Sequence, residues 1–375
     1  MDQVERRTVT VAGFLHGLVH SNILAIPVLL ERAWRVEFSA DDATLGLLAA
    51  SAYAFFGVGS VPFGYLSDRR GAPGLLFVCV AGVAVSLAGI AIAPNLIGLS
   101  LGLGALGLFS GIYHPAGLSL ISRNVREPGC GMGWHGLGGS MGIALGPAAV
   151  GTLLSLGAPW RFAVGALVAP AILGLALLAS SRISDRVLAP VQAGFRDEVR
   201  SLLRRDFVLI LMVYFFAGIA YWGSLTFLPR FVGIETYAFL LALGGVGQVA
   251  AGYVADRPRS ARILLVLSLA GASLLAAFAV PSARTFIAVP WAYGLVLFSL
   301  EPLQNALVTS EVDRGSRGTA FGMAFLSVFG FGSLGAVLSG VLLGAGAVAV
   351  LFIVLGAALG MSGVCAGLAG RRPRR

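Results

Sequence analysis

The chain of 375 residues is 57% hydrophobic and only 11% charged, with a mean hydropathy of +0.90. Soluble proteins are about 25% charged, and a water-facing core stops growing beyond roughly 250–300 residues, so a soluble domain is excluded and lipid must solvate most side chains. The net charge of +9 raises the question of an anionic partner such as nucleic acid. The three cysteines show no paired spacing that would indicate disulfides or a thiolate metal site.

Apolar stretches long enough to cross a bilayer, which takes about 20 residues, follow one another along the chain. They fall at 9–30, 43–66, 73–93, 96–121, 132–155 and 160–180, and then at 207–229, 236–255, 262–281, 285–308, 319–343 and 347–369. The first stretch contains polar residues and no small-residue cleavage pattern, so it is interpreted as a retained helix and not as a cleaved signal. We therefore expect an all-α membrane protein with twelve transmembrane helices.

The arginines predict how these spans are oriented, because cytoplasmic loops carry an excess of positive charge. All 26 basic residues are arginine, and with twelve spans 21 of them fall on the side of the two termini. The basic charge is thus explained by topology, and no nucleic-acid partner is expected. Both termini are predicted to lie in the cytoplasm, with the protein embedded in the lipid bilayer of the cell membrane.

One long polar segment, 181–206, divides the chain into two predicted bundles of six helices, 1–180 and 207–375. Within this segment Phe195, Val199, Leu202 and Leu203 share one helical face, flanked by arginines. That pattern is typical of an amphipathic helix in the membrane interface. A solvated linker that only tethers the two bundles explains it equally well.

An internal repeat indicates that the two halves are copies. Residues 57–69 read GVGSVPFGYLSDR and residues 245–257 read GVGQVAAGYVADR, an offset of 188. At an offset of 187, Tyr113-His114-Pro115 aligns with Leu300-Glu301-Pro302. Parallel, pseudo-symmetric halves with a substrate site between them at the midplane are a known transporter plan.

Two motifs resemble those of the major facilitator superfamily. The segment 64–71 is similar to the signature loop between the second and third helices, through Gly64, Asp68, Arg69 and Gly71, and its second copy supplies Gly252, Asp256 and Arg257. The fifth span resembles the helix-5 motif of exporters and antiporters, at Gly133, Gly142, Gly146, Pro147 and Gly151.

The sequence also departs from the family pattern. Ala72 and Pro73 stand where two basic residues are usual, Val150 replaces a glycine, and the fourth helix lacks the embedded arginine common in proton-coupled drug exporters. The Tyr113-His114-Pro115 string and the histidines of the first helix are similar to fosmidomycin-resistance-type exporters. The fold implied is the twelve-helix fold of the superfamily.

The resemblance implies that Asp68 and Asp256, with Arg69 or Arg257, hold the cytoplasmic side closed during part of the transport cycle. A carboxylate at such a position can accept hydrogen bonds from the amino terminus of a neighbouring helix. The alternative is a plain turn with solvated charges. The helix-5 glycines allow close helix packing, and Pro147 permits a bend.

Ionisable residues inside membrane spans are expensive and usually face a cavity. All four histidines are predicted within spans, and Glu301 is the clearest intramembrane acid. In the architecture that the resemblance implies, the first, fourth, seventh and tenth helices line the cavity, which exposes His16, His20, His114 and Glu301. Histidine changes charge near neutral pH, so these groups are candidates to carry a proton in exchange for substrate.

Structural roles explain the same residues differently. A buried histidine such as His135 often only packs, and Glu301 precedes a proline whose kink frees backbone groups. His16 and His20 are four residues apart and suit a metal, but no other pair has that spacing and the four histidines look scattered. No metal site and no cofactor are therefore predicted.

Polar and aromatic residues on the same helices complete a candidate pocket: Asn22, Tyr53, Tyr113, Tyr214, Tyr221, Trp222, Tyr293, Gln304 and Asn305. They favour an amphipathic organic substrate. The function expected is secondary active transport of a small organic solute by alternating access, as proton-coupled efflux by a monomer. The alternatives are an importer of an organic anion or metabolite, or a transporter of a metal ion or metal chelate. The sequence shows no nucleotide-binding loop, so an ATP-driven pump is not expected. An enzyme is not expected either, because a membrane-embedded enzyme with histidine-bound metal would need several histidine clusters and the four histidines are too few.

Overall fold

The computed structural model of the protein describes residues 1–126, 128–185, 194–255, 257 and 259–369. All regular structure in this part of the chain is helical. Asp256, part of the segment 181–206 and the arginine-rich tail lie outside the described residues, so the predictions made for them have no structural counterpart here.

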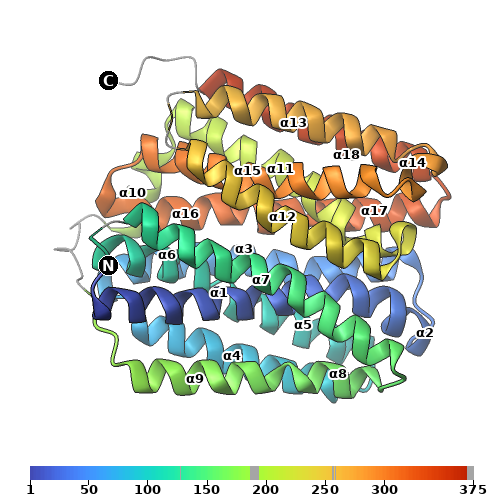
Figure 1. The fold of residues 1–375 in the computed structure, drawn as a ribbon, viewed down its shortest axis with the longest axis horizontal. Helices are drawn as coiled ribbons and strands as arrows, with labels where there is room; N and C mark the ends of the chain where they lie inside the picture. The colour runs from blue at the N-terminus through green and yellow to red at the C-terminus, as the bar shows by residue number, and fades with distance from the viewer. Residues whose placement is uncertain (127, 186–193, 256, 258, 370–375) are drawn as a thin grey trace.

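The first half of the chain forms the lower layer in Figure 1. Its elements are α1 (Gln3–Leu29), a π-helical turn (Leu30–Trp34), α2 (Arg35–Glu37), α3 (Asp42–Arg70), α4 (Pro73–Ala91), α5 (Leu96–Ser110), α6 (Tyr113–Asn124), α7 (Pro128–Ser155), α8 (Trp160–Ala166) and α9 (Val168–Ser181).

The second half forms the upper layer in the same view. Its elements are α10 (Phe195–Leu202), α11 (Arg205–Val232), α12 (Ile234–Ala255), α13 (Ser260–Ala277), α14 (Pro281–Thr285), α15 (Ala288–Glu311), a 3-10 turn (Arg314–Ser316), α16 (Arg317–Phe325), a π-helical turn (Leu326–Gly330), a 3-10 turn (Phe331–Ser333), α17 (Leu334–Gly344) and α18 (Val348–Ala369).

Eleven stretches of the described chain are long and apolar enough to cross a membrane. The tenth predicted span corresponds to α15, whose 24 residues would extend about 36 Å. This helix is less apolar because it contains Glu301, Gln304 and Asn305, and it packs between α12 and α13. With α15 included, the twelve-helix, all-α membrane fold is confirmed.

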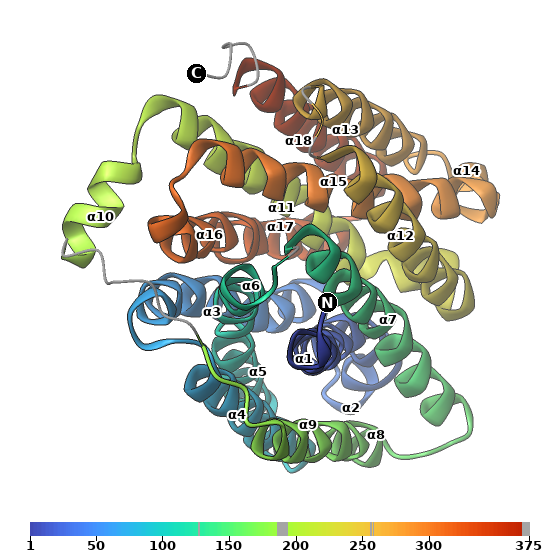
Figure 2. The same cartoon turned by 60° about the vertical axis from the view of Figure 1, so that its left-hand side comes forward.

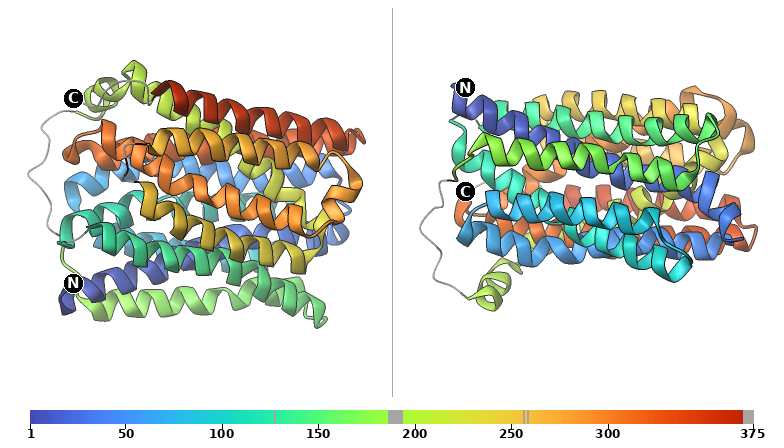
Figure 3. Two further views of the ribbon diagram at one scale, coloured as in Figure 1. Left: turned by 45° about the horizontal axis from the view of Figure 1, so that its top comes forward. Right: turned by 90° about the horizontal axis from the view of Figure 1, so that it is seen from below.

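Both layers lie side by side with their long helices along one direction, as the three ribbon views agree (Figures 1, 2 and 3). Between the layers, α3 packs against α16 and α17, and α7 packs against α12. The start of α1, the end of α3, helix α10 and the start of α16 lie at one end of the bundle, which we call the terminal end.

The fourth and eleventh spans were predicted as continuous helices, but both are interrupted. The fourth breaks at Gly111 and Ile112, between α5 and α6. A side chain at Gly111 would meet the backbone of Phe56 in α3, and the Gly111 carbonyl accepts a hydrogen bond from Ser60 Oγ at 3.2 Å. The break therefore brings α3 close and starts α6 at Tyr113 and His114.

In the eleventh span, a π-helical turn and a 3-10 turn separate α16 from α17. Gly330 and Gly332 lie in this irregular stretch and contact Gly57 of α3 and Gly218 of α11. Such π-helical turns are frequent at functional sites. Three helices thus approach closely at the middle of the boundary between the halves.

Candidate functional site

The four histidines are gathered in one place, contrary to the prediction that they are scattered. His16 and His20 come from α1, His114 from the first turn of α6 and His135 from α7, and all are buried. The ring centroid of His16 lies 4.6 Å from that of His20, 5.1 Å from that of His114 and 4.1 Å from that of His135. Sequence spacing showed only the pair on α1, because the other two histidines arrive through the packing of separate helices.

Hydrogen bonds fix most of this histidine cluster. His16 Nδ1 lies 3.1 Å from the carbonyl oxygen of His135, and His16 Nε2 lies 3.0 Å from His20 Nε2. The Tyr113 hydroxyl donates to the Ala12 carbonyl and lies 2.9 Å from His135 Nε2. His114 Nε2 is buried and has no hydrogen-bond partner.

Glycines make room for the cluster. A side chain at Gly139 of α7 would collide with the His16 ring, and side chains at Gly138, Gly142 and Gly146 would collide with the backbone of α1. Gly142 and Gly146 belong to the predicted helix-5 motif, and Pro147 lies within the same helix. Glycine faces of this kind allow two helices to approach until their backbones touch.

The other two glycines of the helix-5 motif behave differently. Gly151 would meet Ile234 of α12, in the other half, whereas nothing lies within 4 Å of a side chain placed at Gly133. Gly138 and Gly139 were not predicted to matter, although they contact α1 directly. The spacing of glycines in α7 was visible in the sequence, but which of them face α1 depends on how the helix is rotated.

Aromatic side chains fill the boundary between the halves next to His114. Phe325 stacks on His114 at 4.6 Å, Phe56 stacks on Phe329 at 4.0 Å, and Tyr53 stacks on Trp222 at 3.8 Å between ring centroids. Tyr221 lies against Trp222 at 4.7 Å. We call the six residues of this layer the aromatic interface: Tyr53, Phe56, Tyr221, Trp222, Phe325 and Phe329.

Glu301 belongs to a hydrogen-bonded chain that crosses between the halves. Gln248 of α12 donates to Glu301 Oε2 at 2.9 Å, and Gln248 Oε1 accepts from Ser140 Oγ of α7 at 2.7 Å. Glu301 lies in α15 of the second half, whereas Ser140 lies in the first half. Neither Ser140 nor Gln248 was singled out from the sequence, because a single serine or glutamine in an apolar helix carries no distinctive pattern.

Among the remaining predicted pocket residues, some are joined to one another and others have no polar partner. Asn305 accepts a hydrogen bond from the Tyr214 hydroxyl at 2.8 Å. Both side-chain polar atoms of Asn22, the Gln304 amide nitrogen and the Trp222 indole nitrogen are buried without a hydrogen-bond partner. Buried polar atoms without partners are uncommon in native proteins and need an explanation.

At the terminal end, Asp68 lies at the amino terminus of α16. Its Oδ2 accepts from the Thr319 backbone N–H at 3.2 Å, and Arg123 Nη1 lies 3.6 Å from its Oδ1. A side chain at Gly64 would collide with the backbone of Gly318, so α3 and α16 touch here. Gly71 ends α3 with φ +83°, a conformation that favours glycine.

A buried glutamate of the linker helix completes this contact. Glu198 of α10 accepts from Thr319 Oγ1 at 2.6 Å and from Arg69 Nη1 at 3.3 Å. The Arg69 guanidinium also lies 3.5 Å over the Tyr65 ring. Sequence reasoning singled out the apolar face of this helix and missed Glu198, which connects α3, α10 and α16.

Asp185 forms a second buried contact at the same end. It accepts from Arg123 Nη2 at 2.6 Å and from the Ala72 backbone N–H at 2.8 Å. Burial by itself raises the pKa of the Asp185 carboxyl, but hydrogen bonds from Arg123, Ala72 and Asn124 outweigh burial and lower this pKa below its ordinary value. Arg123 was counted in the sequence only as a topological charge.

The second copy of the loop motif is packed differently from the first. Nothing lies within 4 Å of a side chain placed at Gly252, and Arg257 is exposed. Tyr253 is 81% exposed, whereas its counterpart Tyr65 stacks with Arg69 and Phe195. The repeat in sequence is therefore not a repeat of contacts within the described residues.

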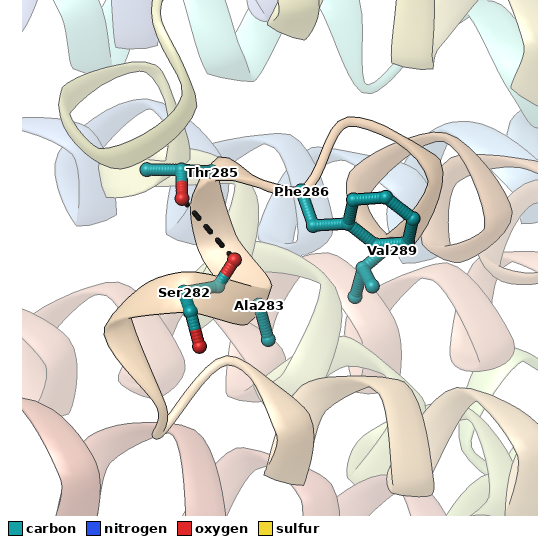
Figure 4. A pocket seen from close by; sticks show the side chains of 5 residues that line it. All are labelled: Ser282, Ala283, Thr285, Phe286 and Val289. Atoms are coloured by element: carbon teal, nitrogen blue, oxygen red, sulfur yellow. Dashed lines mark hydrogen bonds between the residues drawn. The ribbon is translucent and has the colours of Figure 1, made fainter.

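The halves also meet at the end opposite the termini, where Arg230 of α11 donates to Asp42 of α3 at 2.8 Å. Arg35 donates to the same carboxylate at 2.6 Å. A shallow surface pocket at this end is lined by Ser282, Ala283, Thr285, Phe286 and Val289, with a hydrogen bond from Thr285 Oγ1 to the Ser282 carbonyl (Figure 4). The pocket consists of α14 and the start of α15 alone and contains none of the buried residues above.

These features define a polytopic membrane protein with two packed helical halves. Polar contacts join the halves in the middle of the bundle and at both of its ends. Comparison with known proteins gives the family: the model of the major facilitator superfamily matches residues 9–334. The chain belongs to this superfamily, and it is a transporter of small solutes, not an enzyme.

Individual relatives are distant. The chain is 26% identical over 336 residues to a gentisate transporter of Corynebacterium glutamicum, covering 83% of this chain and 74% of the relative. It is 27% identical over 324 residues to the multidrug resistance protein MdtG of Citrobacter koseri, covering 81% and 78%. A solved bacterial homologue of the human lysosomal transporter Spinster, inward-facing and unoccupied, superposes with a TM-score of 0.70 at 17% identity, covering 99% and 96%, which supports the fold.

Proposed function

We propose that the protein exports a small amphipathic organic solute in exchange for protons, with Glu301 as the proton-carrying group. The observation that carries this proposal is the chain from Glu301 through Gln248 to Ser140, which joins a partly buried acid to the boundary between the halves. A hydrogen bond to a carboxylate is stronger than one to a neutral acid. Protonation of Glu301 therefore weakens its hold on Gln248 and loosens the contact of Gln248 with the other half.

The groups around Glu301 suit this role. Gln248 of α12 donates to Glu301 and itself accepts from Ser140 of α7. Asn305 lies one helical turn further along α15 and accepts from Tyr214 of α11. No salt bridge to Glu301 occurs within the described residues. A partly buried acid without a cationic partner can gain and lose a proton without breaking an ion pair.

The aromatic interface and the buried polar atoms without partners support an organic solute. When the halves separate, Tyr53, Trp222 and Phe329 would offer flat apolar faces, and Asn22 and Gln304 would offer hydrogen bonds. The gentisate transporter among the relatives handles an aromatic solute, and the multidrug resistance relative and the helix-5 motif favour export. The competing function is import of an aromatic anion, which the gentisate relative supports.

The proposed setting is the cell membrane, with a monomer whose terminal end faces the cytoplasm. The predicted halves 1–180 and 207–375 then rock about their boundary, and 181–206 connects them. The contacts of Asp68, Thr319 and Glu198 would close the cytoplasmic side, and the contact of Arg230 with Asp42 would close the opposite side.

Proteoliposomes that contain a pH-sensitive dye test the proposal, with gentisate and ethidium as probes. We expect a proton gradient to drive probe movement, and Glu301→Gln to abolish probe-dependent proton flux. Glu235→Gln removes an exposed acid of α12 and serves as the matched control. Undiminished probe-dependent proton flux in Glu301→Gln would refute the role of Glu301 as the proton-carrying group. If the probe moves in the same direction as the protons, the result would favour the importer.

A further inference from the structure

The histidine cluster has a geometry that the transport proposal does not use. His16, His20 and His114 each place a ring nitrogen so that the three nitrogens lie within 4.8 Å of one another. His16 and His20 are four residues apart on one helical face, a spacing that lets two imidazoles bind one metal ion. His114 comes from a different helix and completes the triangle.

The distances are close to those of a metal centre. Zinc binds imidazole nitrogen at about 2.0–2.1 Å in a tetrahedral arrangement, which separates the ligand nitrogens by about 3.3 Å. His16 Nε2 and His20 Nε2 are 3.0 Å apart. The His114 nitrogen needs to move by no more than about 1.5 Å to reach the same separation, which is within the range of a side-chain rotation.

The surrounding hydrogen bonds set the ring nitrogens for this role. The His135 carbonyl can only accept, so His16 Nδ1 carries the proton and His16 Nε2 presents its lone pair toward His20. A backbone carbonyl that fixes the tautomer of a ligating histidine is the usual outer-shell arrangement. His20 Nε2 is then the donor in the 3.0 Å contact. For His20 Nε2 to bind a metal ion as a neutral imidazole, its proton shifts to Nδ1, which frees the Nε2 lone pair for the ion.

The unpartnered atom of His114 is an independent observation. Its side chain is buried, Phe325 and Phe56 cover its ring, and its Nε2 has no hydrogen-bond partner. A buried imidazole nitrogen surrounded by aromatic rings is costly unless something binds it. His135 is different, because the Tyr113 hydroxyl already occupies its Nε2.

We propose that His16, His20 and His114 bind one divalent transition-metal ion of the zinc, cobalt or nickel class. Imidazole ligands select these ions over magnesium and calcium, which prefer oxygen. Three protein ligands leave a fourth position open. Because three neutral imidazoles do not balance the charge of the ion, that position favours an anionic oxygen, from hydroxide or from a solute.

The test uses the full chain, purified without a histidine tag in detergent. Titration with Zn²⁺ is expected to give one ion per chain, and Co²⁺ is expected to give the intense visible absorption of a four- or five-coordinate ion. Mg²⁺ and Ca²⁺ should not compete. If the unmodified chain does not bind Zn²⁺ at one ion per chain, the proposal is overturned. The weak absorption of an octahedral Co²⁺ ion would also overturn it.

Single substitutions then identify the ligands. His16→Gln, His20→Gln and His114→Gln should each weaken Zn²⁺ binding by more than the 10–100-fold that loss of an outer-shell partner costs. His135→Gln removes the fourth histidine of the cluster, which is not a proposed ligand. This variant should lose no more than about 10–100-fold in Zn²⁺ affinity, the cost of losing an outer-shell partner. Unchanged binding in His114→Gln would show that the ligand set is wrong.

The site does not depend on proton exchange at Glu301. Glu301→Gln is expected to bind Zn²⁺ as the unmodified chain does, so failure of the metal proposal and failure of the transport proposal give different results. Loss of Zn²⁺ binding in Glu301→Gln would contradict the assignment of three histidines as the protein ligands.

Discussion

Glu198 offers a direct test of how the terminal end is held closed. Its side chain is 2% exposed and accepts from Thr319 Oγ1 of α16 at 2.6 Å and from Arg69 of α3 at 3.3 Å. Hydrogen bonds to a charged group contribute about 1.5–3 kcal/mol, against about 0.5–1.5 kcal/mol for neutral pairs. Glu198→Gln keeps the shape of the side chain and should therefore cost the closed state about 1–2 kcal/mol.

That loss corresponds to a shift of about 5- to 30-fold toward states open at the terminal end. Double electron–electron resonance can measure the shift between spin labels at Ser180 of α9 and Arg262 of α13, which are exposed on the two halves. The labels require a background in which the native cysteines are replaced by serine. The long-distance population should grow in Glu198→Gln and stay unchanged in Asp197→Asn, an exposed neighbour on the same helix.

A double-mutant cycle with Thr319→Val isolates the pair itself. Residues in direct contact show interaction energies of about 0.5–3 kcal/mol. If the two substitutions add independently, or if Glu198→Gln leaves the distance distribution as it is, Glu198 does not hold the halves together and the reasoning is refuted.

Two further predictions concern stability, measured as the free energy of thermal unfolding in detergent. Gly142→Val places a side chain into the backbone of Gly17 and should destabilise the fold by about 1–3 kcal/mol. The control Gly133→Val has open space around it and should change stability by less than about 0.5 kcal/mol. Equal effects of the two substitutions would contradict the packing of α1 on α7. Asp185→Asn weakens the contact with Arg123 and should cost about 2 kcal/mol at pH 7. Because folding lowers the pKa of Asp185, its stabilisation is complete above about pH 4 and is lost as the pH falls through the folded pKa. The difference between variant and unmodified chain should therefore shrink in acid, and a difference that stays constant from pH 7 to pH 3 would argue against this ion pair.

Much of the fold was predictable because lipid imposes strict requirements on a sequence. Each span must be apolar and helical to satisfy its backbone groups, so composition and span length alone indicated twelve helices. The tenth span, α15, was among them, although Glu301, Gln304 and Asn305 lower the apolarity of this helix, which lies between others. The breaks at Gly111 and near Gly330 were not predictable, because glycine is abundant here and only helix–helix contact shows which glycines interrupt a span.

The site was predictable as a set of residues but not as an arrangement. Burial of His16 and His114 and partial burial of Glu301 followed from their places within spans, and the sequence alone determined that they are costly and candidates for function. Partners such as Ser140, Gln248 and Glu198 were invisible, because the contacts that involve them join helices 53 or more residues apart.

The sequence by itself thus determined the fold class, the membrane environment and the family, since these depend on composition and on local motifs. Only the tertiary structure decided that the four histidines meet and that the two copies of the loop motif differ in their contacts. The physical reason is that a spacing of four residues fixes neighbours on one helix, whereas neighbours on different helices depend on rotation, on breaks and on glycine contacts along the whole bundle.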